Sequence, residues 1–264
     1  MKFCESRPLM KFKDHFSEQA GDYARYRPDY PEALFAFLAK SVTRHDLAWD
    51  CGTGNGQAAL GLTGHFDRVI ATDPSQSQIQ NAVRHEKIDY SVASAEQTGI
   101  PSRSVDLITV AQALHWFRFE PFYEEVRRVL KPDGMLAVWC YGLSRINPDV
   151  DKVVHHYYRN IVGPYWPPER RYIDEKYRTI PFPFVELPTP EFYMKAEWDM
   201  NNLIGYLHTW SATQQCQRKN EQNPIDIIRR ALAKAWGRED ARLTVRWPLY
   251  LRLGRVTALV TNQS

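Results

Sequence analysis

The sequence has little of what would mark a secreted, membrane-bound or metal-binding protein. Residues 1–14 are mixed and basic rather than apolar, and no run approaches the ~20 apolar residues that a membrane helix needs. The 4 cysteines are far apart and form no CxxC pair, which favours a reducing, cytoplasmic setting. No HxxxH or HExxH pattern is present, and the adjacent His155 and His156 would point to different faces of a helix, so no metal site is expected.

The chain also carries little net charge of either sign. The 34 basic residues nearly balance the 31 acidic ones, and the net charge of +3 is too small to indicate a nucleic-acid or membrane partner. The expected partner is therefore a small molecule, and the oligomeric state is left open. What the chain does have is aromatic residues, at 13%, which suit both a core and a ligand pocket.

Short apolar segments alternate with helical ones between Asp46 and Tyr141. The expected strands are buried runs with few polar residues, which favours a parallel sheet covered by helices on both faces. Binding sites in such sheets lie at the carboxyl ends of the strands. The expected strands are Leu47–Asp50, Arg68–Thr72, Ile88–Val92, Val105–Val110 and Met135–Tyr141. The expected helices are Gln57–Leu62, Ser75–Arg84 (with Ser75 as N-cap) and Phe119–Leu130, with a turn at 131–134.

Two regions flank this core, which gives three expected parts: an N-terminal helical cap over 1–45, the core over 46–142, and a cap with the last strands over 143–264. In the first, Phe16, Ala20, Tyr23 and Arg27 share one helical face, Pro28 ends that helix and Pro31 can begin the next. In the last, prolines rule out one long helix across 145–190. There we expect strands at Phe192–Trp198, Arg242–Trp247 and Leu249–Val256, the latter two split by Pro248, and helices at Asn201–Ala212 and Ile225–Trp236.

The segment AWDCGTGNGQAA is the strongest motif. Gly52, Gly54 and Gly56 alternate directly after a strand that ends at Asp50, and glycines let a backbone take positive φ and approach a ligand closely. Dinucleotide sites usually read GxGxxG and would not place an acid beside a pyrophosphate. An acid there suits a ligand with an amine and a sulfonium, at ~1–4 kcal/mol per close charge pair. The alternative is a plain glycine-rich turn.

Two further acids follow the next strands. Asp73, at the end of the second strand, can accept two hydrogen bonds from a ribose diol or can cap the following helix. Glu96, after the third strand, can accept from an adenine amine or can be a solvated loop acid.

The run from Asp50 through Gly134 resembles the class I S-adenosylmethionine-dependent methyltransferases. The pattern Phe16, Ala20, Tyr23, Arg27-Pro28, Tyr30-Pro31 and the later segment VAQALHWF resemble the small-molecule branch that includes trans-aconitate methyltransferase-like proteins. The resemblance is close over residues 12–142 and holds only in outline beyond them. It implies a seven-stranded, mostly parallel Rossmann-like sheet with one antiparallel strand and a helical, aromatic cap. Phe192–Trp198 and Leu249–Val256 are the candidates for its last strands.

The same resemblance implies the cofactor and its contacts. S-adenosylmethionine would be the methyl donor and S-adenosylhomocysteine the product. By this resemblance Asp50, Gly52, Gly54 and Gly56 hold the methionine part, Asp73 and Pro74 lie at the ribose, and Ala95 and Glu96 at the adenine. Gln112 and Ala113 lie where the fourth strand touches the cofactor, and Tyr23 and Arg27 where the N-terminal helix closes over it.

His115 and Trp116 follow the fourth strand and can face the acceptor. A histidine with its reference pKa of ~6.5 can act as a base, so His115 is the candidate catalytic residue, and Trp116 can wall the pocket. The alternative is that both only pack. Beyond Tyr141, interleaved aromatic and basic residues could bind an anionic acceptor such as a carboxylate, with an arginine clamping it, or could form a solvated lid.

The expected function is methyl transfer to a small acceptor. A non-catalytic protein that binds S-adenosylmethionine remains an alternative, as does a nicotinamide-dependent oxidoreductase on the same sheet. A nucleic-acid methyltransferase is disfavoured, because the segment after the fourth strand reads AQALHWF and lacks the Asn/Asp-Pro-Pro-aromatic motif.

Overall fold

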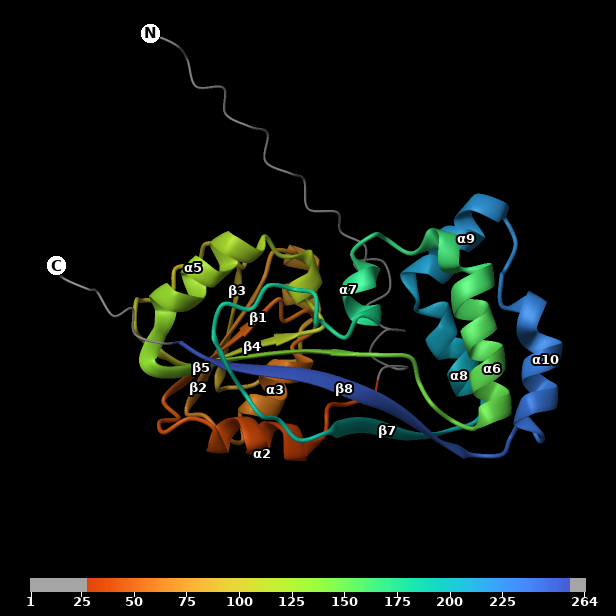
Figure 1. Cartoon of the computed structure of the whole chain (residues 1–264), viewed down its shortest axis with the longest axis horizontal. Helices are drawn as coiled ribbons and strands as arrows, with labels where there is room; N and C mark the ends of the chain where they lie inside the picture. The colour runs from red at the N-terminus through yellow and green to blue at the C-terminus, as the bar shows by residue number, and fades with distance from the viewer. Residues whose placement is uncertain (1–27, 257–264) are drawn as a thin grey trace, which may run out of the picture.

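The computed structural model describes residues 28–256, which form an eight-stranded sheet with helices on both faces and a helical layer at one end (Figure 1). The strand order is β3-β2-β1-β4-β5-β8-β6, and β7 also pairs with β8. Pairing among β1 to β5 is parallel, whereas β8 runs antiparallel to its neighbours. The strands are β1 Leu47–Cys51, β2 Arg68–Asp73, β3 Ile88–Val92, β4 Val105–Ala111, β5 Leu130–Tyr141, β6 Val185–Leu187, β7 Phe192–Trp198 and β8 Leu243–Arg255.

The expected mostly parallel methyltransferase-type sheet with an antiparallel strand is confirmed. Strands β6 and β7 pair with opposite ends of β8 on one edge, and so together take the place of a single interrupted strand. The helices are α2 Glu32–Lys40, α3 Gln57–Leu62, α4 Gln76–Asn81, α5 Phe119–Val129, α6 Pro148–His156, α7 Arg170–Asp174, α8 Met200–His208, α9 Ser211–Asn220 and α10 Asp226–Trp236. Short helical turns of other types are η2 Leu114–Trp116, η3 Tyr157–Ile161 and η4 Gly163–Tyr165.

Burial alternates along the strands and divides the core into two clusters. On one face Leu107 and Trp139 pack with α2 and α3, and on the other Ile108 and Val138 pack with α5. Helices α2 and α3 lie below the sheet in Figure 1 and α5 lies above it. Ser75 caps α4 as expected, since its hydroxyl accepts from the Gln78 amide at 3.3 Å.

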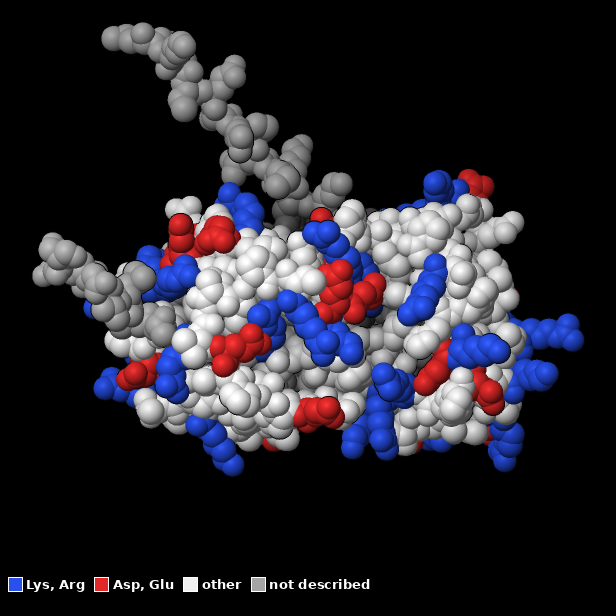
Figure 2. Space-filling view, in the orientation of Figure 1, with Lys and Arg blue, Asp and Glu red and all other residues white. Residues whose placement is uncertain are grey.

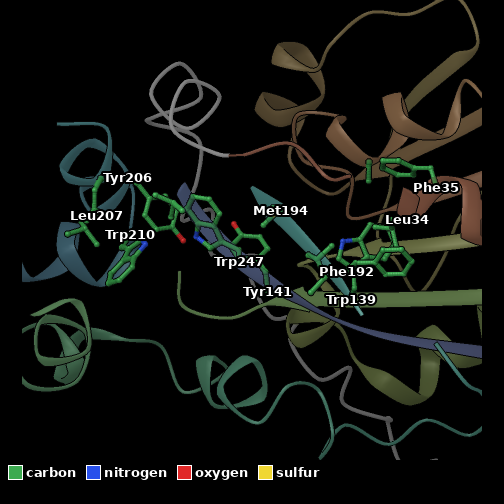
Figure 3. Packing of buried hydrophobic residues seen from close by; sticks show 14 of the residues in the cluster. Leu34, Phe35, Trp139, Tyr141, Phe192, Met194, Tyr206, Leu207, Trp210 and Trp247 are labelled. Atoms are coloured by element: carbon green, nitrogen blue, oxygen red, sulfur yellow. The ribbon is translucent and has the colours of Figure 1, made fainter. Parts of the chain in front are cut away.

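Helices α6, α8, α9 and α10 gather at one end of the molecule, beyond the carboxyl ends of the parallel strands (Figure 1). The core is continuous from the sheet into this layer. Figure 3 shows Trp139 and Tyr141 of β5 followed by Trp247 of β8, then Tyr206 and Trp210 near α8. The rings of Trp247 and Tyr206 are 5.5 Å apart. Strands β7 and β8 extend into the helical layer. The helices of this layer therefore pack directly against the sheet, at the carboxyl ends of its parallel strands.

Pro248 does not split the last strand, so the expectation of two strands there is wrong. The Pro248 carbonyl accepts from the Gly142 amide at 3.3 Å. The nitrogen of Pro248, which carries no hydrogen, points to the same side of β8 as this carbonyl. Because β5 ends at Tyr141, the proline sits where a ladder bond is no longer needed.

Two other expected boundaries are wrong. The turn at 131–134 lies inside β5 as an irregularity, with the register shifting between Val105 and Leu107. The helix expected over Asn201–Ala212 ends at His208, because the Thr209 hydroxyl donates to the Tyr206 carbonyl at 2.7 Å and α9 begins anew at Ser211. The expected first helix, with Tyr23 and Arg27, lies outside the described residues.

Candidate cofactor crevice and acceptor pocket

The three alternating glycines form a loop with left-handed backbone at each glycine. The φ angles are +69° at Gly52, +55° at Gly54 and +84° at Gly56. The amides of Gly52 and Thr53 donate to the Thr72 carbonyl at 2.8 and 2.9 Å, which fastens the loop to the end of β2. Non-glycine residues take such angles at a cost of roughly 1–2 kcal/mol each, which explains the composition of the loop.

Steric surroundings distinguish the three glycines. A Cβ on Gly52 would lie 2.7 Å from the Ala113 Cβ, and one on Gly56 would lie 2.1 Å from the Tyr90 hydroxyl. At Gly54 the nearest atom within the described residues would be Gln78 Oε1, at 3.9 Å. Gly54 is therefore the glycine that borders open space, and a ligand can approach the backbone there.

Asp50 lies beneath the loop and is only 1% exposed. Its carboxylate accepts from the Thr53 hydroxyl at 2.5 Å and from the Thr109 hydroxyl at 2.7 Å. The pKa of Asp50 is raised to about 6, first by burial and to a smaller extent by the nearby Asp73 charge. The hydrogen bonds from the two hydroxyls oppose this rise. A buried carboxylate with this pKa gains from a cation placed beside it.

Asp73 ties the end of β2 to the same loop. One carboxylate oxygen accepts from the Gly54 amide and the other from the Ser75 amide, both at 2.9 Å. Asp73 therefore lies at the crevice with Gly54, as expected from the sequence, and also begins the turn into α4. Pro74, between Asp73 and Ser75, is half-buried in this turn.

The other residues expected at the cofactor lie around the crevice with local roles of their own. Ala113 packs against Gly52, and Ala95 is buried on the α5 side of the sheet. Glu96 accepts from the Arg118 amide at 3.0 Å and so holds the start of α5. Gln112 has φ of +57°, and its side-chain oxygen accepts from the Tyr141 amide at 3.0 Å, which joins the ends of β4 and β5. Their contacts to a cofactor remain predictions.

His115 lies in η2, just beyond β4, and is 6% exposed. Its Nδ1 is 2.8 Å from the hydroxyl of Tyr177, a fully buried residue held at φ of +59°. Burial, and after it the Arg170 charge, lowers the pKa of His115 to about 3. The pKa of His115 therefore lies well below the reference value from which its role as a base was predicted, and a catalytic role for His115 stays a prediction. The neighbouring Trp116 is 36% exposed.

Arg170 of α7 packs against two neighbouring aromatic rings in the segment after β5, Tyr158 and Trp166, whose centres are 5.1 Å apart. Its guanidinium carbon lies 4.4 Å from the Trp166 ring centre and 5.2 Å from that of Tyr158. Nε donates to the Tyr158 hydroxyl at 2.8 Å, and Asp174 lies 3.8 Å from the same nitrogen. Within residues 28–256, neither Nη atom donates a hydrogen bond, and the buried Trp166 indole N–H also has no acceptor. Arg170 therefore keeps unused donors, and its charge reaches His115.

Sequence reasoning missed the partners of the expected residues. Thr109 was detectable as a polar residue inside an apolar strand, but its bond to Asp50 depends on the pairing of β1 with β4. The contact of Tyr177 with His115 joins residues 62 positions apart, and no local pattern indicates it. Across residues 28–256, no group of three or more His, Cys, Asp or Glu side chains could hold a metal ion, and no helix is long and apolar enough to span a membrane.

Comparison with known proteins finds methyltransferases that match most of the chain. A family model described as a methyltransferase domain matches residues 49–138, which include the glycine loop and Asp73. A Dictyostelium discoideum protein named as a methyltransferase is 37% identical, over 93% of this chain and 96% of its own length. A Saccharomyces cerevisiae protein named as an S-adenosylmethionine-dependent methyltransferase is 26% identical, over 90% of this chain and 95% of its own length.

A solved structure shares the fold almost end to end. It is described as a type II methyltransferase from Anaeromyxobacter dehalogenans and is 44% identical, with a TM-score of 0.83 over 88% of this chain and 98% of that one. The similarity therefore extends through the helical layer as well as the crevice.

Proposed function

Because this chain belongs to the class I S-adenosylmethionine-dependent methyltransferases, we propose that it methylates a small organic acceptor bearing a carboxylate. Membership sets aside the nicotinamide-dependent oxidoreductase. The acceptor class rests chiefly on one observation, an arginine packed against two aromatic rings with both terminal nitrogens unused.

The crevice suits the donor S-adenosylmethionine in shape and charge. Gly54 borders open space, and Asp50 and Asp73 supply negative charge at the ends of neighbouring strands. We assign the glycine loop and Asp50 to the methionine part, where its ammonium and sulfonium would relieve the buried carboxylate. We assign Asp73 to the ribose diol, whose hydroxyls can donate to a carboxylate.

S-adenosylmethionine, when bound, supplies an activated methyl group on a sulfonium. What remains for the protein is to align the acceptor oxygen with that methyl and to exclude water. Arg170 would bind the acceptor carboxylate, and the rings of Tyr158 and Trp166 hold the guanidinium in place. A carboxylate acceptor is already ionised, so a neutral His115 with a pKa of about 3 is no obstacle to the reaction. His115 then positions Tyr177 rather than moving a proton.

Affinity for S-adenosylhomocysteine should fall as the pH drops below about 6, because Asp50 is then protonated and no longer attracts the ammonium group. In Asp50→Asn the affinity should be about tenfold weaker at pH 8 and nearly independent of pH. Calorimetric titration between pH 5 and pH 8 measures both. A pH profile shared by the two proteins would contradict the role of Asp50.

The same substitution should stabilise the unliganded protein at high pH. The folded pKa of Asp50, about 6, lies above its ordinary value of 3.8, so its contribution to stability is full below pH 3.8 and is lost as the pH rises through 6. The difference between the folded pKa and the ordinary pKa corresponds to about 3 kcal/mol in the free energy of unfolding. Asp50→Asn should therefore unfold at a higher temperature than the wild type at pH 8 and at a similar temperature at pH 4.

Release of S-adenosylhomocysteine in the presence of candidate acceptors tests the proposal. The panel should pair each carboxylic acid with its primary amide, which has nearly the same shape but no charge, and should include phenols and amines. We expect turnover with at least one acid and none with its amide. Turnover confined to phenols or amines, or none with any acceptor, would refute the carboxylate proposal.

Arg170→Gln should raise KM for the acid about tenfold with little change in kcat, since a charge-assisted hydrogen bond contributes about 1.5–3 kcal/mol. Arg171→Gln is the matched control, because Arg171 is the exposed next residue and its guanidinium lies over Tyr172. Steady-state kinetics of both variants with the best acid provide the measurement. Equal KM values in the two variants would remove Arg170 from the acceptor site.

A further inference from the structure

A hollow of about 620 Å³ lies on the outer face of the β7–β8 ribbon, beyond the end of β5 and apart from the glycine crevice. Its lining includes Arg145, Ile146, Tyr193, Leu243, Arg246 and Pro248. Basic side chains gather over the middle of the face that carries β7 and β8 (Figure 2). The volume is in the range of small-molecule sites.

The backbone brings the basic side chains together. Arg145 and Arg246 face each other across an isolated bridge, with the two N–H···O bonds at 2.7 and 2.9 Å. Lys195 is the partner of Arg246 in the β7–β8 ladder. Residues directly opposite each other project to the same face of a sheet, so the three cationic side chains share one face.

The charges of the arginines reach two tyrosines. A hydrogen bond to Glu191 raises the pKa of Tyr193, and Arg145 and Arg246 both oppose this rise. Burial raises the pKa of Tyr250, and Arg145 opposes it. Arg145 therefore lies near both rings, and Arg246 lies near the first.

Neither arginine is neutralised by the surrounding protein. Arg145, Lys195 and Arg246 form no ion pair with any residue between 28 and 256. The acids near the hollow have other hydrogen-bond partners: Glu191 accepts from the Tyr193 hydroxyl at 2.8 Å, Glu197 from the Thr244 hydroxyl at 2.6 Å, and Asp151 from the Ile146 amide at 2.8 Å. Adjacent cations without counter-charges repel one another, so an anion bound between them would relieve this repulsion.

We infer that this hollow is a second binding site, which takes a phosphate monoester of a small organic molecule. Two planar guanidinium groups suit the several oxygens of a doubly charged phosphate better than those of a single carboxylate. Ile146, Leu243, Pro248 and the Tyr193 ring offer apolar surface to the organic part. The site is independent of the acceptor pocket at Arg170.

Phenyl phosphate is the probe, because it joins a phosphate to an aromatic body, with benzoate and inorganic phosphate as weaker comparisons. We expect saturable binding by calorimetry, and we expect Arg145→Gln and Arg246→Gln each to weaken it at least about tenfold. Both substitutions leave the backbone bridge intact, and circular dichroism checks the fold.

Two controls separate this site from others. Arg230→Gln, an exposed position on α10, should leave phenyl phosphate binding unchanged, and so should Arg170→Gln. Binding of S-adenosylhomocysteine should be the same in all of these variants, whether or not methyl transfer is ever detected. No saturable binding of phenyl phosphate, or binding lost in Arg170→Gln but kept in Arg145→Gln and Arg246→Gln, would overturn the second site.

Discussion

Gly54→Ala is expected to weaken binding of S-adenosylhomocysteine at least about 100-fold while the protein stays folded. The backbone of Gly54 has φ of +55°, which an alanine takes at a cost of roughly 1–2 kcal/mol. No described protein atom lies nearer than 3.9 Å to the added methyl, so the fold can accept it. The methyl would instead enter the space that we assign to the donor.

Two other glycines serve as controls for this prediction. Gly64→Ala should change neither stability nor affinity, because its Cβ would have no described neighbour within 4 Å. Gly56→Ala should lower the unfolding temperature much more than Gly54→Ala, because its Cβ would lie 2.1 Å from the Tyr90 hydroxyl. Calorimetric titration and thermal unfolding of the three variants provide the measurements. Wild-type affinity in Gly54→Ala would show that the donor does not lie against this loop.

Asp73→Asn is expected to weaken S-adenosylhomocysteine binding about 100-fold, or about 2.7 kcal/mol. The substitution keeps the shape of the side chain but turns one of its acceptor oxygens into a donor. One of the bonds to the Gly54 and Ser75 amides is then lost, together with an acceptor for the ribose diol.

A ligand without the diol separates the two effects of Asp73→Asn. The 2′,3′-dideoxy analogue of S-adenosylhomocysteine should bind the wild type and Asp73→Asn with more similar affinities than S-adenosylhomocysteine does. Asp240→Asn is the control for loss of an acidic charge, because Asp240 is exposed and pairs only with Arg238 among the described residues. An Asp73→Asn variant with wild-type affinity would place the ribose elsewhere.

The strands and the crevice could be predicted because both are encoded locally. Apolar runs bounded by turns predicted the ends of β1 to β4 to within one residue. The glycines directly after β1 predicted where the loop lies. The resemblance to methyltransferases then indicated that two late strands, one of them antiparallel, complete the sheet. The failure at Pro248 depends on where the neighbouring strand β5 ends, whereas the failure at Thr209 arises from a local bond between its hydroxyl and the Tyr206 carbonyl.

The chemistry of the site was less accessible to sequence reasoning. The pKa of His115 depends on its burial and on the Arg170 charge, and that of Asp50 on burial opposed by hydroxyls from two different elements. Such shifts arise from tertiary contacts that spacing does not encode. Residue types thus predicted that Asp73 and the glycine loop lie together, as the Gly54–Asp73 bond shows, but they could not predict protonation states.

A crystal structure of the protein with S-adenosylhomocysteine tests the central claim most directly. We expect the sulfur and the amino-acid part beside Gly52 and Gly54, above Asp50, with both ribose hydroxyls within hydrogen-bonding distance of Asp73. Electron density for the ligand at any other place, with the glycine loop in contact only with solvent, would contradict it.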